Sequence, residues 1–217
     1  MKTRSYQSGL TYEKYDRDHI AIYFNETTKE VPSGNDREST QVEYEYDTVL
    51  VAAETPSVEA FAAALVANGI ALLDAQAIAT GIIFASIQKG QLEGDELAAA
   101  KEMVRAKITA YDSSSAVNEF TYHGTPMWLD KDTRAGLMLR LNAEQAGGHE
   151  NTTLWYGTQS FSLPVSSAIQ MLTALELYAS ACFDMTEEHK AAVDAKRTVN
   201  TVLAYDYTQG YPEKLAF

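Results

Sequence analysis

The histidines and the single cysteine are the residues of this chain whose side chains are best suited to metal binding or nucleophilic chemistry. The histidines are His19, His123, His149 and His189, and none is spaced like a metal-binding pair. With one cysteine, Cys182, the chain forms no intrachain disulfide and no thiolate metal cluster. We therefore expect structural or solvent-facing roles for the histidines, a core position for the cysteine, and no metal or cofactor.

Two carboxylates at alternate positions, Asp130 and Asp132, resemble the start of a calcium loop. Such a loop needs glycine as its sixth residue and glutamate as its twelfth, whereas here these residues are alanine and leucine. The better interpretation is a helix N-cap at Asp130, with Asp132 as a favourable charge in the first turn. Arg134 is then expected to pair with a hairpin carboxylate such as Glu119.

Motifs of the common enzyme classes are absent from the sequence. It contains no GxGxxG, no GxxxxGK[ST] and no GxSxG string, and the serines at 113–115 are interpreted as a polar linker. Glycoside hydrolysis would need two carboxylates in a cleft, and no acidic pair is distinguished by its neighbours. We therefore predict that the chain is not an enzyme.

Composition narrows the remaining classes of protein. The 217 residues are 46% hydrophobic and 22% charged, enough to bury a core, and the formal net charge is −13. This balance argues against binding to nucleic acid or to anionic lipid. The most apolar stretch, residues 61–87, is rich in alanine and interrupted by Asp74, so we expect buried helices and no membrane insertion.

Residues 1–54 are predicted to be a tyrosine-rich β attachment segment. Strands are expected at residues 19–24 and 41–51, separated by a turn at residues 31–36. A two-stranded hairpin alone is marginal in water, so this segment needs support from the rest of the chain or from a partner. The aromatic candidates for contacts with a partner are Tyr12, Tyr15, Tyr23, Phe24, Tyr44 and Tyr46.

Residues 55–112 are predicted to form a small helical subdomain. Ser57 is expected to cap the first helix, which Gly69 ends. Asp74 is expected to cap a second helix and Asp95 a third. Apolar residues at spacings of three and four follow each start, which is typical of core packing.

Residues 113–217 are predicted to form an α+β domain with the order ββαββα. Alternating residues at 117–122 precede a turn and a short strand, and a helix follows Asp130. The same order repeats from residue 152, with Pro164 at the start of the second helix and Thr186 as an N-cap that restarts it. The tail, residues 205–217, is expected to pack on the domain through its tyrosines, Leu215 and Phe217.

The predicted fold class is therefore α+β. It consists of an N-terminal β-hairpin segment, a small helical subdomain and a C-terminal two-layer ββαββα sandwich, in which the two hairpins would join as one sheet. Trp128 and Trp155 fall at matching places in the two hairpins. At least one of them is expected in the layer between sheet and helices.

Several strings in this sequence resemble a known family. They are YDSSSAVNEF at 111–120, MWLDKDTRAGL at 127–137, TLWYG at 153–157 and SAIQMLTALELYASACFD at 167–184, and the likeness extends over about residues 57–194. They resemble a domain family of unknown function found in phages and prophages of Bacteroides-like hosts. Related domains lie beside or within tail-fibre and tail-fibre-assembly genes. The resemblance implies a phage tail context and brings no catalytic residues.

Together, the resemblance and the residues predict a structural protein of a phage tail, at the tail tip, the baseplate or the fibre base. It would act through contacts with other tail proteins and as a homo-oligomer, in a virion assembled in the host cytoplasm. The alternative is a tail-fibre assembly chaperone that leaves before the particle is complete, because an acidic, soluble surface suits transient association.

Overall fold

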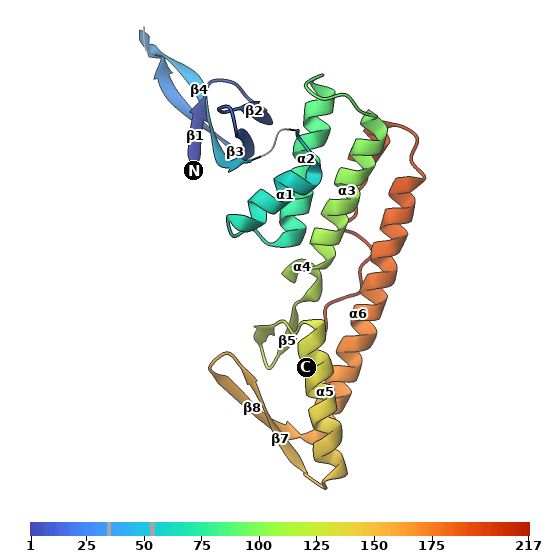
Figure 1. Ribbon diagram of the computed structural model, residues 1–217. Coiled ribbons are helices and arrows are strands. Elements are labelled where there is room, and N and C mark those ends of the chain that lie inside the picture. Colours follow the sequence, from blue (N-terminus) through green and yellow to red (C-terminus); the bar gives the residue numbers. More distant parts are fainter. Residues whose placement is uncertain (34–35, 53–54) are drawn as a thin grey trace. The chain divides into compact units, whose positions relative to one another are not determined.

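The fold is α+β, with antiparallel strand pairs beside helices, and 47% of residues lie in helices and 25% in strands (Figure 1). The structure, a computed structural model, describes residues 1–33, 36–52 and 55–217. Two compact units divide the chain. The first contains Met1–Ala110 and Val193–Tyr205, and the second contains Tyr111–Ala192 and Asp206–Phe217.

The first unit begins with a four-stranded antiparallel sheet in the order β1-β4-β3-β2. Its strands are β1 (Lys2–Ser5), β2 (Tyr12–Lys14), β3 (Ile20–Ser33) and β4 (Asp36–Val51). The predicted hairpin is therefore flanked by two further short strands. The turn expected at 31–36 is largely strand, because β3 continues to Ser33 and β4 starts at Asp36. Residues 34 and 35 of that turn, and residues 53 and 54 at the expected segment boundary, lie outside the described residues.

Helices α1 (Val58–Ala67), α2 (Leu72–Gln88) and α3 (Glu96–Asp112) follow the sheet. The cross-strand pairs Ile20–Val51 and Ile22–Val49 form one core with residues of α1 and α2. Phe61 of α1, which is fully buried in this core, contacts the ring of Tyr12 with centroids 5.8 Å apart. The sheet thus buries one face against helices, which is the support that a short hairpin requires.

Local capping rules account for most of the helix starts in this unit. Ser57 accepts a hydrogen bond from the Ala60 N–H at 3.2 Å and caps α1, as predicted. Asp95 accepts from the Ala98 N–H at 3.0 Å, which confirms the expected start of α3. The prediction for α2 was wrong. Its N-cap is Ala71, without a side-chain hydrogen bond, and Asp74 lies within the first turn.

The second unit has the predicted ββαββα order. Its hairpins are β5 (Phe120–Tyr122) with β6 (Thr125–Met127), and β7 (Asn151–Tyr156) with β8 (Gln159–Pro164). The helices are α4 (Ser115–Asn118), α5 (Lys131–Ala146) and α6 (Val165–Asp194), while α7 (Val199–Leu203) belongs to the first unit. The two hairpins form separate two-stranded sheets and do not join as one sheet.

One apolar core holds the hairpins and helices of the second unit together. Its buried members include Phe120, Leu141, Leu154, Leu163 and Leu172. In β7 the side chains alternate, with Thr152 and Leu154 buried and their neighbours exposed, as a half-covered strand requires.

The expectation that a tryptophan lies between sheet and helices was wrong. Trp128 is 44% exposed and Trp155 is 68% exposed. Trp155 follows the buried Leu154 in β7, so the alternation of the strand turns its side chain to the opposite, outer face. The backbone N–H of Trp128 donates to the hydroxyl of Tyr156 at 3.3 Å.

Asp130 caps α5, as predicted. One carboxylate oxygen accepts from the Thr133 N–H and the other from the Thr133 hydroxyl, each at 2.8 Å. These hydrogen bonds hold the pKa of Asp130 below its ordinary value. The expected pairing of Arg134 with Glu119 was wrong, because Arg134 pairs with Glu176 at 3.0 Å.

Arg134 also donates from its Nη1 to the Leu129 carbonyl oxygen at 2.7 Å, and its side chain is only 13% exposed. It therefore ties the segment before α5 to α6. Glu119 pairs with Lys214 of the tail at 3.6 Å instead.

Thr186 does not restart a helix, because α6 runs without interruption from Val165 to Asp194. Pro164 ends β8 directly before this helix, so the expected start is confirmed. Thr186 is 2% exposed, and its hydroxyl lies 2.9 Å from the hydroxyl of Tyr211. A tertiary contact with the tail therefore satisfies the side chain that would otherwise favour a cap.

The tail packs on the second unit through the residues that the sequence indicated. The rings of Tyr207 and Tyr211 both contact Tyr111, with centroids 5.8 and 5.6 Å away. The segment at Leu215 and Phe217 runs parallel to β5, where the Thr121 N–H donates to the Leu215 carbonyl at 2.9 Å. The tail thus adds a parallel segment beside the β5–β6 hairpin.

Candidate functional site in the N-terminal sheet

Two of the six aromatic candidates for partner contacts, Tyr23 and Tyr46, lie in the interior of the first unit. They are 4% and 1% exposed, and their rings meet edge to face with centroids 5.9 Å apart. The Tyr23 hydroxyl donates to the carboxylate of Glu13. Burial, reinforced by this carboxylate, raises the pKa of Tyr23 above its ordinary value. These two side chains stabilise the sheet and are not presented to a partner.

The hydroxyl of Tyr46 organises the loop between β1 and β2. It lies 2.9 Å from the Gln7 carbonyl oxygen and 2.6 Å from Glu26 Oε2, and it accepts from the Leu10 N–H at 3.3 Å. Burial, with the carboxylate of Glu26 nearby, raises the pKa of Tyr46 to about 12. Glu26 also accepts from the Gly9 N–H. One buried hydroxyl therefore fixes both the loop and the position of a carboxylate.

The other four aromatic candidates differ in exposure. Tyr12, Phe24 and Tyr44 are half-buried, and all three pack against buried clusters of the sheet. The hydroxyl of Tyr12 donates to the Gln91 carbonyl oxygen at 3.2 Å. Tyr15, at 56% exposed, is the candidate most available to a partner.

Beyond the core, β3 and β4 continue as a two-stranded ribbon, which we call the β3–β4 arm (residues 29–33 and 36–43). Its pairs run from Lys29–Glu43 past Glu30–Val42 to Pro32–Thr40. Strand β1 pairs only with residues 44–47 of β4, and β2 pairs only with residues 20–22 of β3. Among the described residues, no strand covers either outer edge of the arm.

A break in register separates the arm from the part of the hairpin that packs on helices. The pairing shifts between Phe24 and Thr27, and Asn25 has a φ of 53°. Such a bulge bends the strand and increases its twist. At the bulge, neighbouring side chains make different contacts. Asn25 donates to Asp47 of β4, and Glu26 accepts from the Tyr46 hydroxyl.

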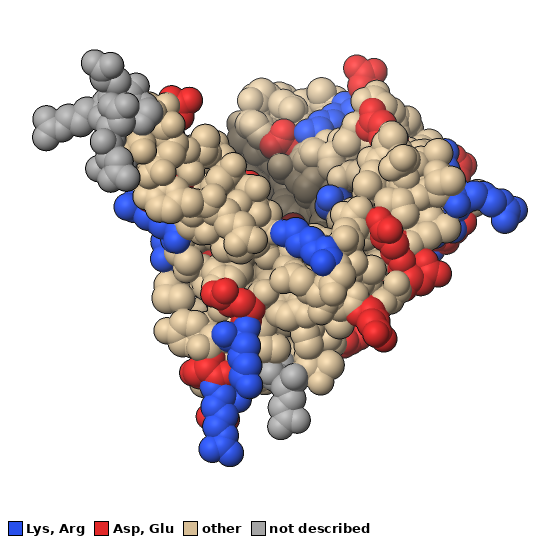
Figure 2. All heavy atoms as spheres, turned by 90° about the horizontal axis from the view of Figure 1, so that it is seen from above, with Lys and Arg blue, Asp and Glu red and all other residues tan. Residues whose placement is uncertain are grey.

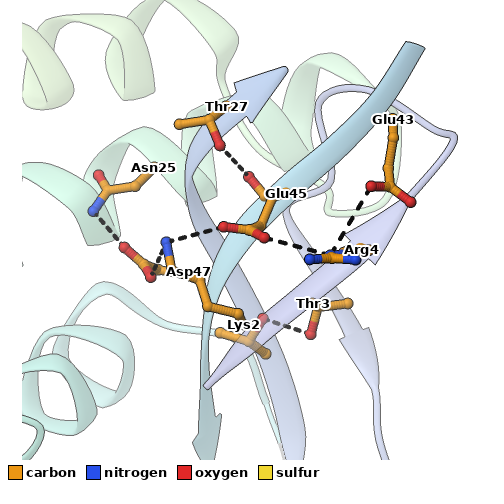
Figure 3. A network of polar contacts seen from close by, with 9 residues as sticks. Lys2, Thr3, Arg4, Asn25, Thr27, Glu43, Glu45 and Asp47 are labelled. Atoms are coloured by element: carbon orange, nitrogen blue, oxygen red, sulfur yellow. Dashed lines mark hydrogen bonds and ion pairs between the residues drawn. The ribbon is translucent and has the colours of Figure 1, made fainter. Parts of the chain in front are cut away.

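A network of charged and polar side chains covers the sheet at the base of the arm (Figure 3). Its members are Lys2 and Arg4 of β1, Asn25 of β3, and Glu43, Glu45 and Asp47 of β4. Asp47 accepts from the Asn25 amide at 2.9 Å and pairs with Lys2 at 3.0 Å, and these two contacts lower its pKa. Because these groups are largely solvated, the network fixes the register of β1 more than it stabilises the unit.

A cleft of about 550 Å³ lies between the bulge of β3 and helix α2. Its sheet side includes Leu10, Phe24 and Glu26, and its helix side includes Ile78 and Gly81. The volume is within the range of small-ligand and side-chain pockets. No motif in the sequence marks this cleft. The α2 residues that line it were interpreted as core, because a helical stripe of apolar residues has the same pattern whether it is covered or open.

The charge of the molecule is not gathered at one place on the face seen in Figure 2, where acidic and basic side chains alternate among uncharged ones. Over the ranges that the structure describes, no group of three or more His, Cys, Asp or Glu side chains is placed to hold a metal ion. No helix in those ranges has both the length and the apolarity to span a bilayer. The features that remain as a candidate binding site are the strand edges of the arm and the cleft beside α2.

The comparisons with known proteins bear on the second half of the chain. A family model described as a domain of unknown function, DUF4376, matches residues 99–209. The match includes most of α3, both C-terminal hairpins and α6, and it spans half of the chain. The chain therefore belongs to the DUF4376 family. No curated protein matches the chain, and no solved structure matches it.

Proposed function

We propose that this protein is a structural component of a phage tail, at the tip, the baseplate or the fibre base, and that it acts through contacts with other tail proteins and with further copies of itself. The proposal is that of a binding protein and not of an enzyme. The tail context comes from the resemblance of strings such as MWLDKDTR to domains in tail regions, and the mode of action comes from the arm.

The observation that carries the proposal is the β3–β4 arm, neither outer edge of which is covered by a strand of the described residues. A two-stranded ribbon is marginal in water on its own, and an uncovered edge offers backbone N–H and C=O groups to a further strand. Addition of a strand to such an edge is a common mode of protein recognition. Val42, 41% exposed, adds an apolar contact on one face of the arm.

Edges of this kind also need protection against indiscriminate pairing. The arm carries Pro32, which lacks an N–H donor, and Lys29, which is exposed, and the bulge at its base increases the twist. These features favour a selected partner over self-association into extended sheets.

The test is mass spectrometry of purified particles of the phage that encodes the protein. We expect its peptides in intact particles at a constant ratio to other tail proteins. If they are missing from particles but the protein co-purifies with tail fibres during assembly, the alternative, a tail-fibre assembly chaperone, is supported instead. Its net charge of −13 suits such a transient association.

A matched pair of variants tests the role of the arm. Val42→Lys places a charge on the arm, and Leu203→Lys makes the same change at a residue of α7 that is 45% exposed. We expect both proteins to fold, and only Val42→Lys to lower incorporation into particles. Equal incorporation of the two variants would contradict a role for the arm.

A further inference from the structure

The cleft between the β3 bulge and α2 has a floor that is apolar and free of bulky groups. One face of α2 supplies Ala77, Ile78, Gly81, Ile82 and Ala85, at the spacing of three and four that places residues on one side of a helix. Ala77, Ile78, Gly81 and Ala85 are half-buried, so this floor remains partly open to solvent. An apolar side chain from another molecule would cover it.

Glycine at position 81 keeps the middle of the floor low. A Cβ built there would meet only Met103 Sδ, at 3.9 Å, which is an ordinary contact. The backbone of Gly81 does not require a glycine, because its φ is not in the left-handed region. Neither the backbone conformation nor a close neighbour therefore requires glycine here, and its lack of a side chain leaves this part of the floor uncovered.

Two carboxylates line the cleft. Glu26 is held in place by the Tyr46 hydroxyl at 2.6 Å and by the Gly9 N–H. Asp74, in the first turn of α2, is exposed and has no hydrogen-bond or ion-pair partner among the described residues. A cation beside them would be favoured by Coulomb attraction and would replace water on a carboxylate that is already oriented.

Two lysines also lie at this cleft and add hydrogen-bond donors to it. Lys107 of α3 lines the cleft, and Lys89 at the end of α2 donates to the Gly9 carbonyl oxygen. Lys89 is therefore already hydrogen-bonded to the β1–β2 loop. Lys107 has no partner among the described side chains and can donate to a carbonyl oxygen. A peptide carries such carbonyls, and a free amine does not.

We infer that this cleft binds a short segment of a partner protein in which an apolar side chain is flanked by lysine or arginine. The apolar side chain rests on α2, the basic side chains pair with Asp74 and Glu26, and Lys107 contacts the backbone of the segment. The net charge of −13 favours the approach of such a basic segment. The inference rests on the proposed function in one respect, since it places the ligand on a partner protein.

Three capped pentapeptides serve as probes in NMR titrations of the full-length protein, with Lys-Phe-Lys, Glu-Phe-Glu or Lys-Ser-Lys between terminal glycines. We expect the Lys-Phe-Lys peptide to shift the methyl signals of Ile78 and Ile82 and to bind most tightly. Replacing phenylalanine by serine should weaken binding about tenfold, because the apolar contact is lost. High salt should weaken it as well.

Two variants that remove one negative charge each provide the control. Asp74→Asn is expected to weaken binding of the Lys-Phe-Lys peptide about threefold. Glu93→Gln, at an exposed residue that does not line the cleft, should leave binding unchanged. Thermal melting of both variants checks that the fold is intact.

The inference is overturned if millimolar Lys-Phe-Lys peptide shifts no signals of cleft residues, or if the Glu-Phe-Glu peptide binds as tightly. Either result leaves the proposed tail function standing, because that function is tested by the content of purified particles. Conversely, if the protein is absent from particles but still binds the basic peptide, the inference about the cleft stands and the proposed tail function does not.

Discussion

The two units of this protein use β-hairpins differently. In the second unit the strands are only 3 or 6 residues long. The inner faces of both hairpins contribute to one core. In the first unit β3 and β4 are 14 and 16 residues long, whereas the apolar pairs that pack on helices are confined to Ile20–Val51 and Ile22–Val49. The hairpins of the second unit therefore lie within the core, whereas β3 and β4 extend well beyond the residues that form theirs.

The largest effect should come from the core part of the long hairpin. Ile22→Ala, at a fully buried position, is expected to lower the free energy of unfolding by about 3 kcal/mol, because it removes apolar contacts and leaves a cavity. Val42→Ala, in the same hairpin but on the arm, should change it by less than about 0.5 kcal/mol. Urea denaturation measures both. Similar losses at the two positions would show that the arm is part of the cooperative core.

A smaller effect is expected from the hydroxyl that fixes the loop of the first unit. Tyr46→Phe keeps the ring but removes the contacts with Gln7, Glu26 and Leu10, and should cost about 1–2 kcal/mol in urea denaturation. Tyr15→Phe, at an exposed position, serves as the control and should leave stability unchanged. If the two variants were equally stable, the buried hydroxyl would have no role in holding the loop.

A change with pH is expected from the second unit, through the cap of α5. Since the folded-state pKa of Asp130 is lowered, its ionised form stabilises the fold above the ordinary pKa of 3.8, and this contribution is lost as the pH falls through the folded value. Asp130→Asn keeps a capping side chain but does not titrate. We expect the wild type to be more stable than the variant near neutral pH, and the difference in melting temperature to shrink in acid. A difference that stays constant with pH would contradict this.

The smallest effect is expected at Trp155, on the outer face of the β7–β8 hairpin. With the side chain 68% exposed, Trp155→Ala should change the free energy of unfolding by less than about 0.5 kcal/mol. Tryptophan emission that acrylamide quenches readily should be present in the wild type and reduced in the variant. A large loss of stability would mean that the outer face of this hairpin is covered as well as its inner face.

The features that the sequence predicted correctly depend on a few neighbouring residues. Ser57, Asp95 and Asp130 were identified as caps because a capping side chain bonds to an N–H two or three residues away. The apolar face of α6 and the ββαββα order follow from periodicity for the same reason.

Features set by distant segments were missed. Alternation in β7 reveals two faces but not which one is covered, so the position of Trp155 could not be derived. Residues 25–33 are polar and contain Pro32, and they were interpreted partly as a turn, yet pairing with β4 keeps them extended. The cleft needs the bulge of β3 beside α2, and Thr186 is explained only by Tyr211, which lies 25 residues further along the chain.

The division of the chain into units has a consequence for biosynthesis. Each unit takes its last piece from beyond residue 192: Val193–Tyr205 joins the first, and Asp206–Phe217 joins the second. Arg105, near the end of the first long stretch, pairs with Asp194, and Thr121 bonds to Leu215. A nascent chain on the ribosome therefore completes neither unit until residues 193–217 emerge, and both units close within the same short interval of translation.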